Sequence, residues 1–275
     1  MKDKNVLFHI DDFWASQSSN RAWFDLLKKW YVKSWSVMVP CNWFDDAAKT
    51  LKTEKDIDMW VHLTLTSERN SPHQQWGPTL NAKDVPSLID KDWLFYKTTN
   101  EVLSNANYED IKKEICNQIR IALLSWINVS HIDSHMGVLL HEETFDIYKE
   151  VAKLFKIQPF ISTPHESYRK GNRFFKCDNG INELHEVWFH VFDDCNCDSP
   201  YLNEDYQENF SRRLANVKKW TTYFLLHVLP NSLDPNDFTP DMEARIREYN
   251  YLMNDDNFVS WLRKNCINSI SMKDI

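Results

Sequence analysis

Short apolar runs alternate with longer amphipathic stretches along the whole chain. This alternation is typical of repeated βα units that build a parallel sheet. The predicted strands are 5–11, 34–39, 58–66, 130–135, 158–162, 186–192, 222–228 and 269–272. The predicted helices are 20–33, 45–51, 108–127, 142–155, 205–220, 240–253 and 258–264. Roughly seven or eight such units predict an α/β fold, an irregular (β/α) barrel that is TIM-barrel-like and forms a single domain over residues 1–275.

Composition and charge narrow the class of protein. The length of 275 residues suits one α/β barrel, which typically needs about 250 residues. A net charge of −8 without any basic run argues against nucleic acid and against an anionic membrane surface as partners. No apolar run approaches the ~20 residues that span a bilayer, and no signal-peptide pattern precedes the first strand. With six scattered cysteines, these features predict a cytoplasmic protein with reduced thiols.

Polar residues interrupt the predicted strands near their carboxyl ends, where barrel enzymes place their chemistry. In the first strand His9 and Asp11 share one face, and Asp12 follows directly. Adjacent carboxylates that leave an apolar strand are costly to bury unpaired, and a bound cation would offset that cost. An aspartate that caps a helix or forms a turn is the alternative interpretation.

Two further strands each carry one histidine. His62 lies on the polar face of a cleanly alternating segment, Val-His-Leu-Thr-Leu-Thr from residue 61. His227 closes the apolar run Tyr-Phe-Leu-Leu from residue 223. A lone strand histidine is more often a structural residue than a ligand, so each of these positions alone is a weak signal.

The segment His131-Ile-Asp133-Ser-His135 is the strongest local signal in the chain. A period of two places its three polar side chains on one face of a strand, pointing into the barrel. That arrangement is costly unless the side chains ligate a metal or hydrogen-bond one another.

Aromatic residues are candidates for contacts with a sugar. The chain has 12 tryptophans, and aromatic faces pack against the apolar C–H surfaces of sugars. Trp14 follows the carboxylate pair, and Trp76 lies in the long irregular segment after the His62 strand. Simple core packing is the alternative for each. The acidic pairs at 45–46, 193–194 and 255–256 are interpreted as caps or turns.

Taken in order, these motifs resemble the YdjC-like carbohydrate deacetylases, the group that includes chitooligosaccharide deacetylase. The motifs are Asp-Asp-Phe from residue 11, His-Leu-Thr-Leu-Thr from residue 62, His-x-Asp-Ser-His from residue 131, and the late strand-end histidine at 227. The resemblance runs over nearly the whole chain. It implies one divalent metal held by Asp12, His62 and His135. It also implies Asp11 as general base or water-orienting group, and His227 as the general acid that protonates the leaving amine.

The resemblance predicts a metal-dependent hydrolase that removes the acetyl group from an N-acetylated sugar or oligosaccharide. Two imidazoles favour Zn²⁺, Co²⁺ or Ni²⁺, and Mg²⁺ is expected from the family. Trp14, Trp76, His131 and Asp133 are the candidates for substrate binding. The expected partner is a small-molecule sugar, with no nucleic acid and no membrane, and a homodimer is left open.

Two alternatives remain open. One is a metal hydrolase of another substrate class, since the fold does not determine the substrate. The other is a catalytically impaired sugar-binding barrel. It is motivated by Trp14, which stands where the family usually has glycine, and by Val228-Leu229 after His227, where the family usually has a Pro-Gly-like segment.

Overall fold

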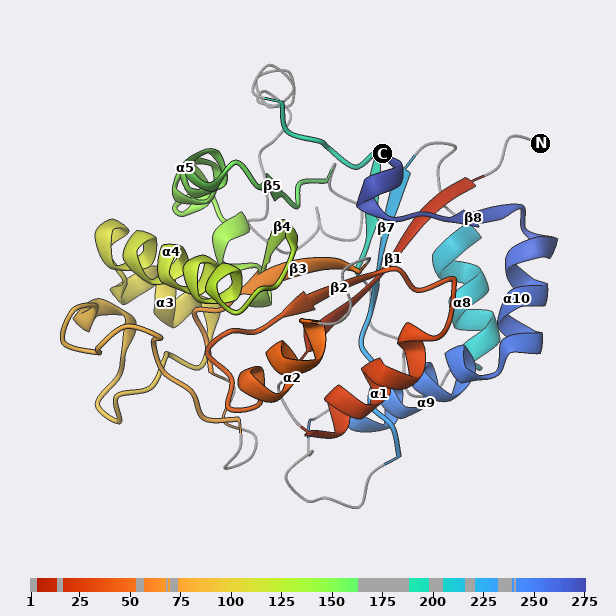
Figure 1. Ribbon diagram of the computed structural model, residues 1–275, viewed down its shortest axis with the longest axis horizontal. Coiled ribbons are helices and arrows are strands. Elements are labelled where there is room, and N and C mark those ends of the chain that lie inside the picture. The colour runs from red at the N-terminus through yellow and green to blue at the C-terminus, as the bar shows by residue number, and fades with distance from the viewer. Residues whose placement is uncertain are drawn as a thin grey trace.

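The computed structural model describes residues 4–13, 17–52, 57–67, 69, 74–162, 188–197, 205–215, 221–231, 239 and 241–275. Its centre is one parallel sheet with the strand order β5-β4-β3-β2-β1-β7-β6, and β8 pairs with β1 outside this order (Figure 1). The strands are β1 (Lys4–Phe13), β2 (Ser34–Val37), β3 (Asp58–Leu63), β4 (Val129–Ser134), β5 (Gln158–Pro159), β6 (Asp194–Asn196), β7 (Thr221–Leu226) and β8 (Ile267–Ser269).

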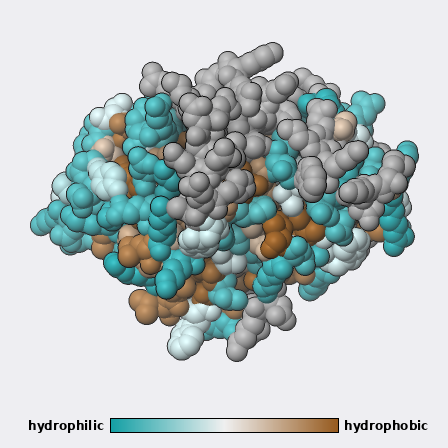
Figure 2. Space-filling model, turned by 90° about the horizontal axis from the view of Figure 1, so that it is seen from above, coloured by the Kyte–Doolittle hydropathy of each residue, from teal (hydrophilic) through white to brown (hydrophobic). Residues whose placement is uncertain are grey.

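Helices lie around the outside of this sheet (Figure 1). They are α1 (Gln17–Leu27), α2 (Phe44–Leu51), α3 (Thr99–Asn105), α4 (Tyr108–Leu124), α5 (Phe145–Phe155), α8 (Tyr206–Ala215), α9 (Met242–Met253) and α10 (Asp255–Lys264). Among the described residues, no helix is long and apolar enough to cross a membrane. Figure 2 shows hydrophobic side chains in small groups between hydrophilic ones on the face that it presents.

The sheet curls until its two outer strands meet. Ser162, just after β5, forms a parallel bridge with Phe192, just before β6. The amide of Phe192 donates to the carbonyl of Ile161 at 2.9 Å. This contact turns the open order of strands into an irregular barrel, which confirms the α/β barrel that the sequence predicted.

The two faces of the sheet carry different sets of side chains, because successive residues of a strand point to opposite faces. On β1, Val6, Phe8 and Ile10 belong to the large core between sheet and helices. The opposite face of the sheet carries a second, aromatic cluster that includes Trp60 and Tyr223, whose ring centroids are 5.9 Å apart. This cluster fills the barrel interior. The polar residues nearer the carboxyl ends of the strands therefore pack against apolar side chains.

One predicted strand was placed wrongly. Residues 188–191 form no strand, Phe192 makes only the isolated bridge, and the strand is β6, which begins at Asp194. The acidic pair, expected in a turn, is satisfied locally. Asp193 accepts hydrogen bonds from the amide and hydroxyl of Thr221, at 2.8 and 3.1 Å, and Asp194 accepts one from the Cys195 amide at 3.0 Å. These bonds let a charged sequence pair in register with β7.

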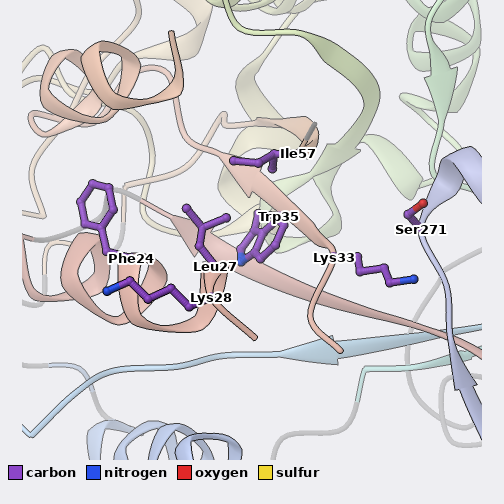
Figure 3. Close-up of a pocket in the computed structure, with 7 residues that line it drawn as sticks. All are labelled: Phe24, Leu27, Lys28, Lys33, Trp35, Ile57 and Ser271. Carbon is purple, nitrogen blue, oxygen red and sulfur yellow. The ribbon is translucent and has the colours of Figure 1, made fainter. Parts of the chain in front are cut away.

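A pocket lies at the amino-terminal edge of the sheet, where β1 changes its neighbour. β1 pairs with β8 from Lys4 to Val6 and with β2 only from His9 onward. The pocket has a volume of about 530 Å³ and is lined by Phe24, Leu27, Lys28, Lys33, Trp35, Ile57 and Ser271 (Figure 3). It therefore lies at the opposite edge from the carboxyl ends of the strands.

Candidate metal centre

Three side chains from three strand ends converge at the carboxyl edge of the barrel. Asp12 lies near the carboxyl end of β1, His62 lies on β3, and His135 comes directly after β4. Asp12 Oδ1 is 3.1 Å from His135 Nδ1 and 3.6 Å from His62 Nε2, and one ligand atom of each residue lies within 4.8 Å of the others. Ligand atoms bonded at about 2.0–2.2 Å around one ion lie roughly 3–3.5 Å apart, so this group can hold a metal ion.

The backbone of β1 brings consecutive carboxylates into the same site. In a regular strand Asp11 and Asp12 would point to opposite faces of the sheet. Asp12 has a φ of 57°, in the left-handed region, and the pairing of β1 with β2 shifts register between Ile10 and Phe13. Such an irregularity redirects a side chain next to a functional site. The positive φ therefore explains how both members of the pair reach the centre.

Asp133 orients one of the imidazoles. His62 Nδ1 is 2.8 Å from Asp133 Oδ1, so Nδ1 donates to that carboxylate and Nε2 is the ring nitrogen that faces Asp12. This is the arrangement in which a carboxylate fixes the tautomer of a metal-binding histidine. Burial disfavours the charged ring, but the carboxylates of Asp133 and Asp11 raise the pKa of His62 well above its ordinary value. The same negative field favours a cation at this position.

Arg245, on α9, binds the second oxygen of Asp12. Its Nη1 donates to Asp12 Oδ2 at 3.0 Å, and its Nε donates to Asp241 Oδ1 at 2.9 Å. Burial would raise the pKa of Asp12, but hydrogen bonds from His135 and His62 and the charge of Arg245 hold it well below its ordinary value. Asp12 therefore stays ionised at neutral pH. The sequence analysis did not predict Arg245, because nothing in its own segment relates it to β1.

Asp11 and His227 flank this group. Asp11 Oδ1 accepts a hydrogen bond from Ser36 Oγ at 3.1 Å, and Asp11 Oδ2 is 3.9 Å from His62 Nε2. His227 Nε2 lies 3.7 Å from Asp12 Oδ2. Burial and the nearby charge of Arg245 lower the pKa of His227 below its ordinary value.

The buried side chains of Glu248 and Arg213 hold the backbone next to His227 in place. The His227 amide donates to Glu248 Oε2 at 2.6 Å, and Glu248 Oε1 in turn accepts from Arg213 Nη1 at 3.1 Å. Arg213 also donates to the carbonyl of Leu225 at 2.7 Å. This buried network fixes the end of β7 and with it the place of the imidazole.

The remaining candidates lie in different surroundings. Trp76 is only 3% exposed, and its indole N–H donates to the Thr66 carbonyl at 2.7 Å, so it presents no open ring face. His131 stacks on Trp60, with centroids 5.0 Å apart, and its ring nitrogens have no hydrogen-bond partner within the described part of the chain. Burial lowers the pKa of His131 to about 3. Trp14 lies outside the described residues. Substrate binding by these residues stays a prediction.

The fold and the centre define an α/β barrel with a carboxylate–imidazole group suited to a divalent cation. The family model for the YdjC-like protein matches residues 5–264, and the chain belongs to this family.

Curated relatives and a solved structure are consistent with this assignment. A carbohydrate deacetylase from Thermoanaerobacter pseudethanolicus is 24% identical over 161 residues, which cover 58% of this chain and 61% of that protein. One from Thermus thermophilus is 28% identical over 156 residues, or 57% and 53% of the two chains. The matched part thus spans little more than half of these relatives. A protein from Enterococcus faecalis that was named for a proposed cleavage of cellobiose phosphate shares the fold, with a TM-score of 0.79 over 99% of this chain and 98% of that chain at 17% identity.

Proposed function

We propose that this protein is a metal-dependent carbohydrate deacetylase that hydrolyses the acetamide of an N-acetylated sugar or oligosaccharide. The observation that carries the proposal is the convergence of Asp12, His62 and His135 on one point at the carboxyl edge of the barrel. The names of the curated relatives supply the reaction class.

The donor set suits a single divalent cation. Asp12, His62 and His135 would hold it and leave positions open for water and for the acetyl oxygen. A bound ion of this kind lowers the pKa of water toward ~7 and polarises a carbonyl group. Two imidazoles favour Zn²⁺, Co²⁺ or Ni²⁺, while Mg²⁺ is the alternative to be tested with them.

Asp11 would accept the proton of the attacking water. Its carboxylate lies beside the ligand group, and the hydroxyl of Ser36 holds one of its oxygens at 3.1 Å. The other oxygen is the one nearer to His62. A positioned carboxylate of this type contributes typically 10²–10⁴-fold to the rate, as an order of magnitude.

His227 would deliver a proton to the leaving amine. It follows directly after β7, its Nε2 lies 3.7 Å from Asp12 Oδ2, and its backbone amide donates to Glu248. A general acid must be protonated when the C–N bond breaks. Because the pKa of His227 lies below its ordinary value, its protonated form is a ready proton donor.

The test is acetate release from N-acetylglucosamine oligomers. The purified protein is stripped with a chelator, and Zn²⁺, Mg²⁺, Co²⁺ or Ni²⁺ is added back separately, with Asp12→Ala as the matched inactive control. We expect acetate release that depends on the added metal and is lost in Asp12→Ala. Release of phosphate from sugar phosphates without acetate would contradict the proposal, as would sugar binding by calorimetry with no acetate from any metal.

A further inference from the structure

His9 lies beneath the metal centre, between two carboxylates. Its side chain is fully buried, and Nδ1 is 2.7 Å from Ser34 Oγ. Nε2 is 3.0 Å from Asp11 Oδ1 and 3.3 Å from Asp133 Oδ2. One imidazole therefore contacts the carboxylate proposed as the base and the carboxylate that orients a metal ligand.

These contacts form a continuous connection across the floor of the site. Asp133 uses one oxygen for His62 Nδ1, at 2.8 Å, and turns the other toward His9. His9 then reaches Asp11, whose second oxygen faces His62. The proposed base and the imidazole of His62 are thus joined through one ring, and a displacement of that ring would disturb both.

The ring of His9 is held in place by its neighbours. Its centroid is 4.2 Å from that of Trp60 and 5.3 Å from that of Tyr223, and Ser34 anchors the far nitrogen. Burial disfavours a charge here, but Asp11 and Asp133 raise the pKa of His9 above its ordinary value. Two carboxylates in one buried site repel each other, and a cationic ring between them relieves that repulsion.

We propose that His9 is a positioning residue that holds Asp11 as proton acceptor and, through Asp133, sets the orientation of His62. The inference rests on the proposed function for its effect on turnover, but not for its effect on metal affinity. His9 touches neither the substrate nor the metal. It acts by holding the carboxylates of Asp11 and Asp133, which in turn position the proton acceptor for the water and the imidazole of His62 for the cation.

The alternative is that His9, Asp11 and Asp133 bind a second cation, because ligand atoms of these residues also lie within 4.8 Å of one another. The charges favour the ring. Four carboxylates, those of Asp11, Asp12, Asp133 and Asp241, face one guanidinium, that of Arg245. One divalent ion at the Asp12 group and a protonated His9 ring together neutralise this set, whereas a second divalent ion in place of that ring charge would leave a positive charge uncompensated in a buried site.

The experiment compares His9→Leu with His9→Gln in the full chain. Leucine keeps the apolar bulk and removes the close contacts of both ring nitrogens, while glutamine keeps an amide that can donate toward the carboxylates. Tyr148→Phe is the control, because it removes a buried hydrogen bond from α5 to the backbone carbonyl of Ile132, at 2.7 Å. The measurements are kcat and KM for acetate release, the apparent Kd for Zn²⁺ by chelator competition, the metal content per chain, and thermal unfolding.

We expect His9→Leu to lower kcat and to weaken Zn²⁺ binding by about 10–100-fold each, with KM changed little. His9→Gln should recover most of the kcat and most of the Zn²⁺ affinity. Tyr148→Phe should lose thermal stability while its kcat and Zn²⁺ affinity stay unchanged. Folded His9→Leu with unchanged Zn²⁺ affinity would overturn the proposal. A metal content of two ions per wild-type chain that falls to one ion in His9→Leu would overturn it as well. Zn²⁺ affinity needs no acetylated substrate, so a failed deacetylase assay does not obscure this result.

Discussion

Asp133→Asn separates two roles for a residue that its motif alone predicts to bind substrate. The Asp133 carboxylate is 2.8 Å from His62 Nδ1, so we expect it to orient His62 as the proposed metal ligand. Asparagine has nearly the same shape, and its amide oxygen can still accept the hydrogen of Nδ1. The substitution therefore removes the negative charge while it keeps the contact and the packing.

The magnitude follows from the kind of hydrogen bond. A hydrogen bond to a charged group contributes about 1.5–3 kcal/mol, and a neutral one about 0.5–1.5 kcal/mol. The Asp133 side chain is only 3% exposed, so solvent screens this difference little. A loss of about 1.4 kcal/mol corresponds to roughly tenfold weaker metal binding. We expect kcat to fall at limiting metal and KM for the oligosaccharide to change less than about threefold.

The assay measures the apparent Kd for Zn²⁺ by competition with a chromophoric chelator, and then kcat and KM at saturating metal. Asp58→Asn is the matched control. This buried carboxylate lies at the other end of β3, where it accepts from the Met272 amide at 2.8 Å, and its loss should leave metal affinity unchanged. Unchanged Zn²⁺ affinity in Asp133→Asn together with a raised KM would refute the orienting role and favour direct contact with the sugar.

Other substitutions test the remaining parts of the site. Asp12→Ala or His135→Ala should abolish both metal binding and activity, and metal retained in elemental analysis would contradict the ligand assignment. His227→Ala should keep the metal but slow turnover by about 10²-fold, and unchanged kcat would remove His227 from the mechanism. Because the pKa of His227 lies below its ordinary 6.5 and a general acid must be protonated, kcat should decline with rising pH from a midpoint below that value. An alkaline limb that persists in His227→Ala would show that another group causes it. Arg213→Met leaves the Glu248 carboxylate buried without its cation, so urea unfolding should show a loss of about 3–5 kcal/mol, and a loss under ~1 kcal/mol would contradict this.

The sequence alone determined the faces of the strands and the residues that can meet at the carboxyl edge. The period of two placed His131 and Asp133 on one face of β4 and His62 on the polar face of β3, and His135 follows directly after β4. Parallel strands present their carboxyl ends on the same side, so residues from distant segments were bound to approach one another there. The group of Asp12, His62 and His135 follows from these local rules together with the family resemblance.

The tertiary structure decided the partners of those residues. Arg245 and Asp12 are 233 positions apart, and they meet because α9 packs beside the end of β1. The positive φ of Asp12 brings both carboxylates into the centre, where strict alternation would separate them. The place of Trp76 in the core likewise depends on how a long irregular segment folds back. Local periodicity records which side of a strand a residue occupies, but a hydrogen-bond partner depends on packing between segments that no single stretch of sequence contains.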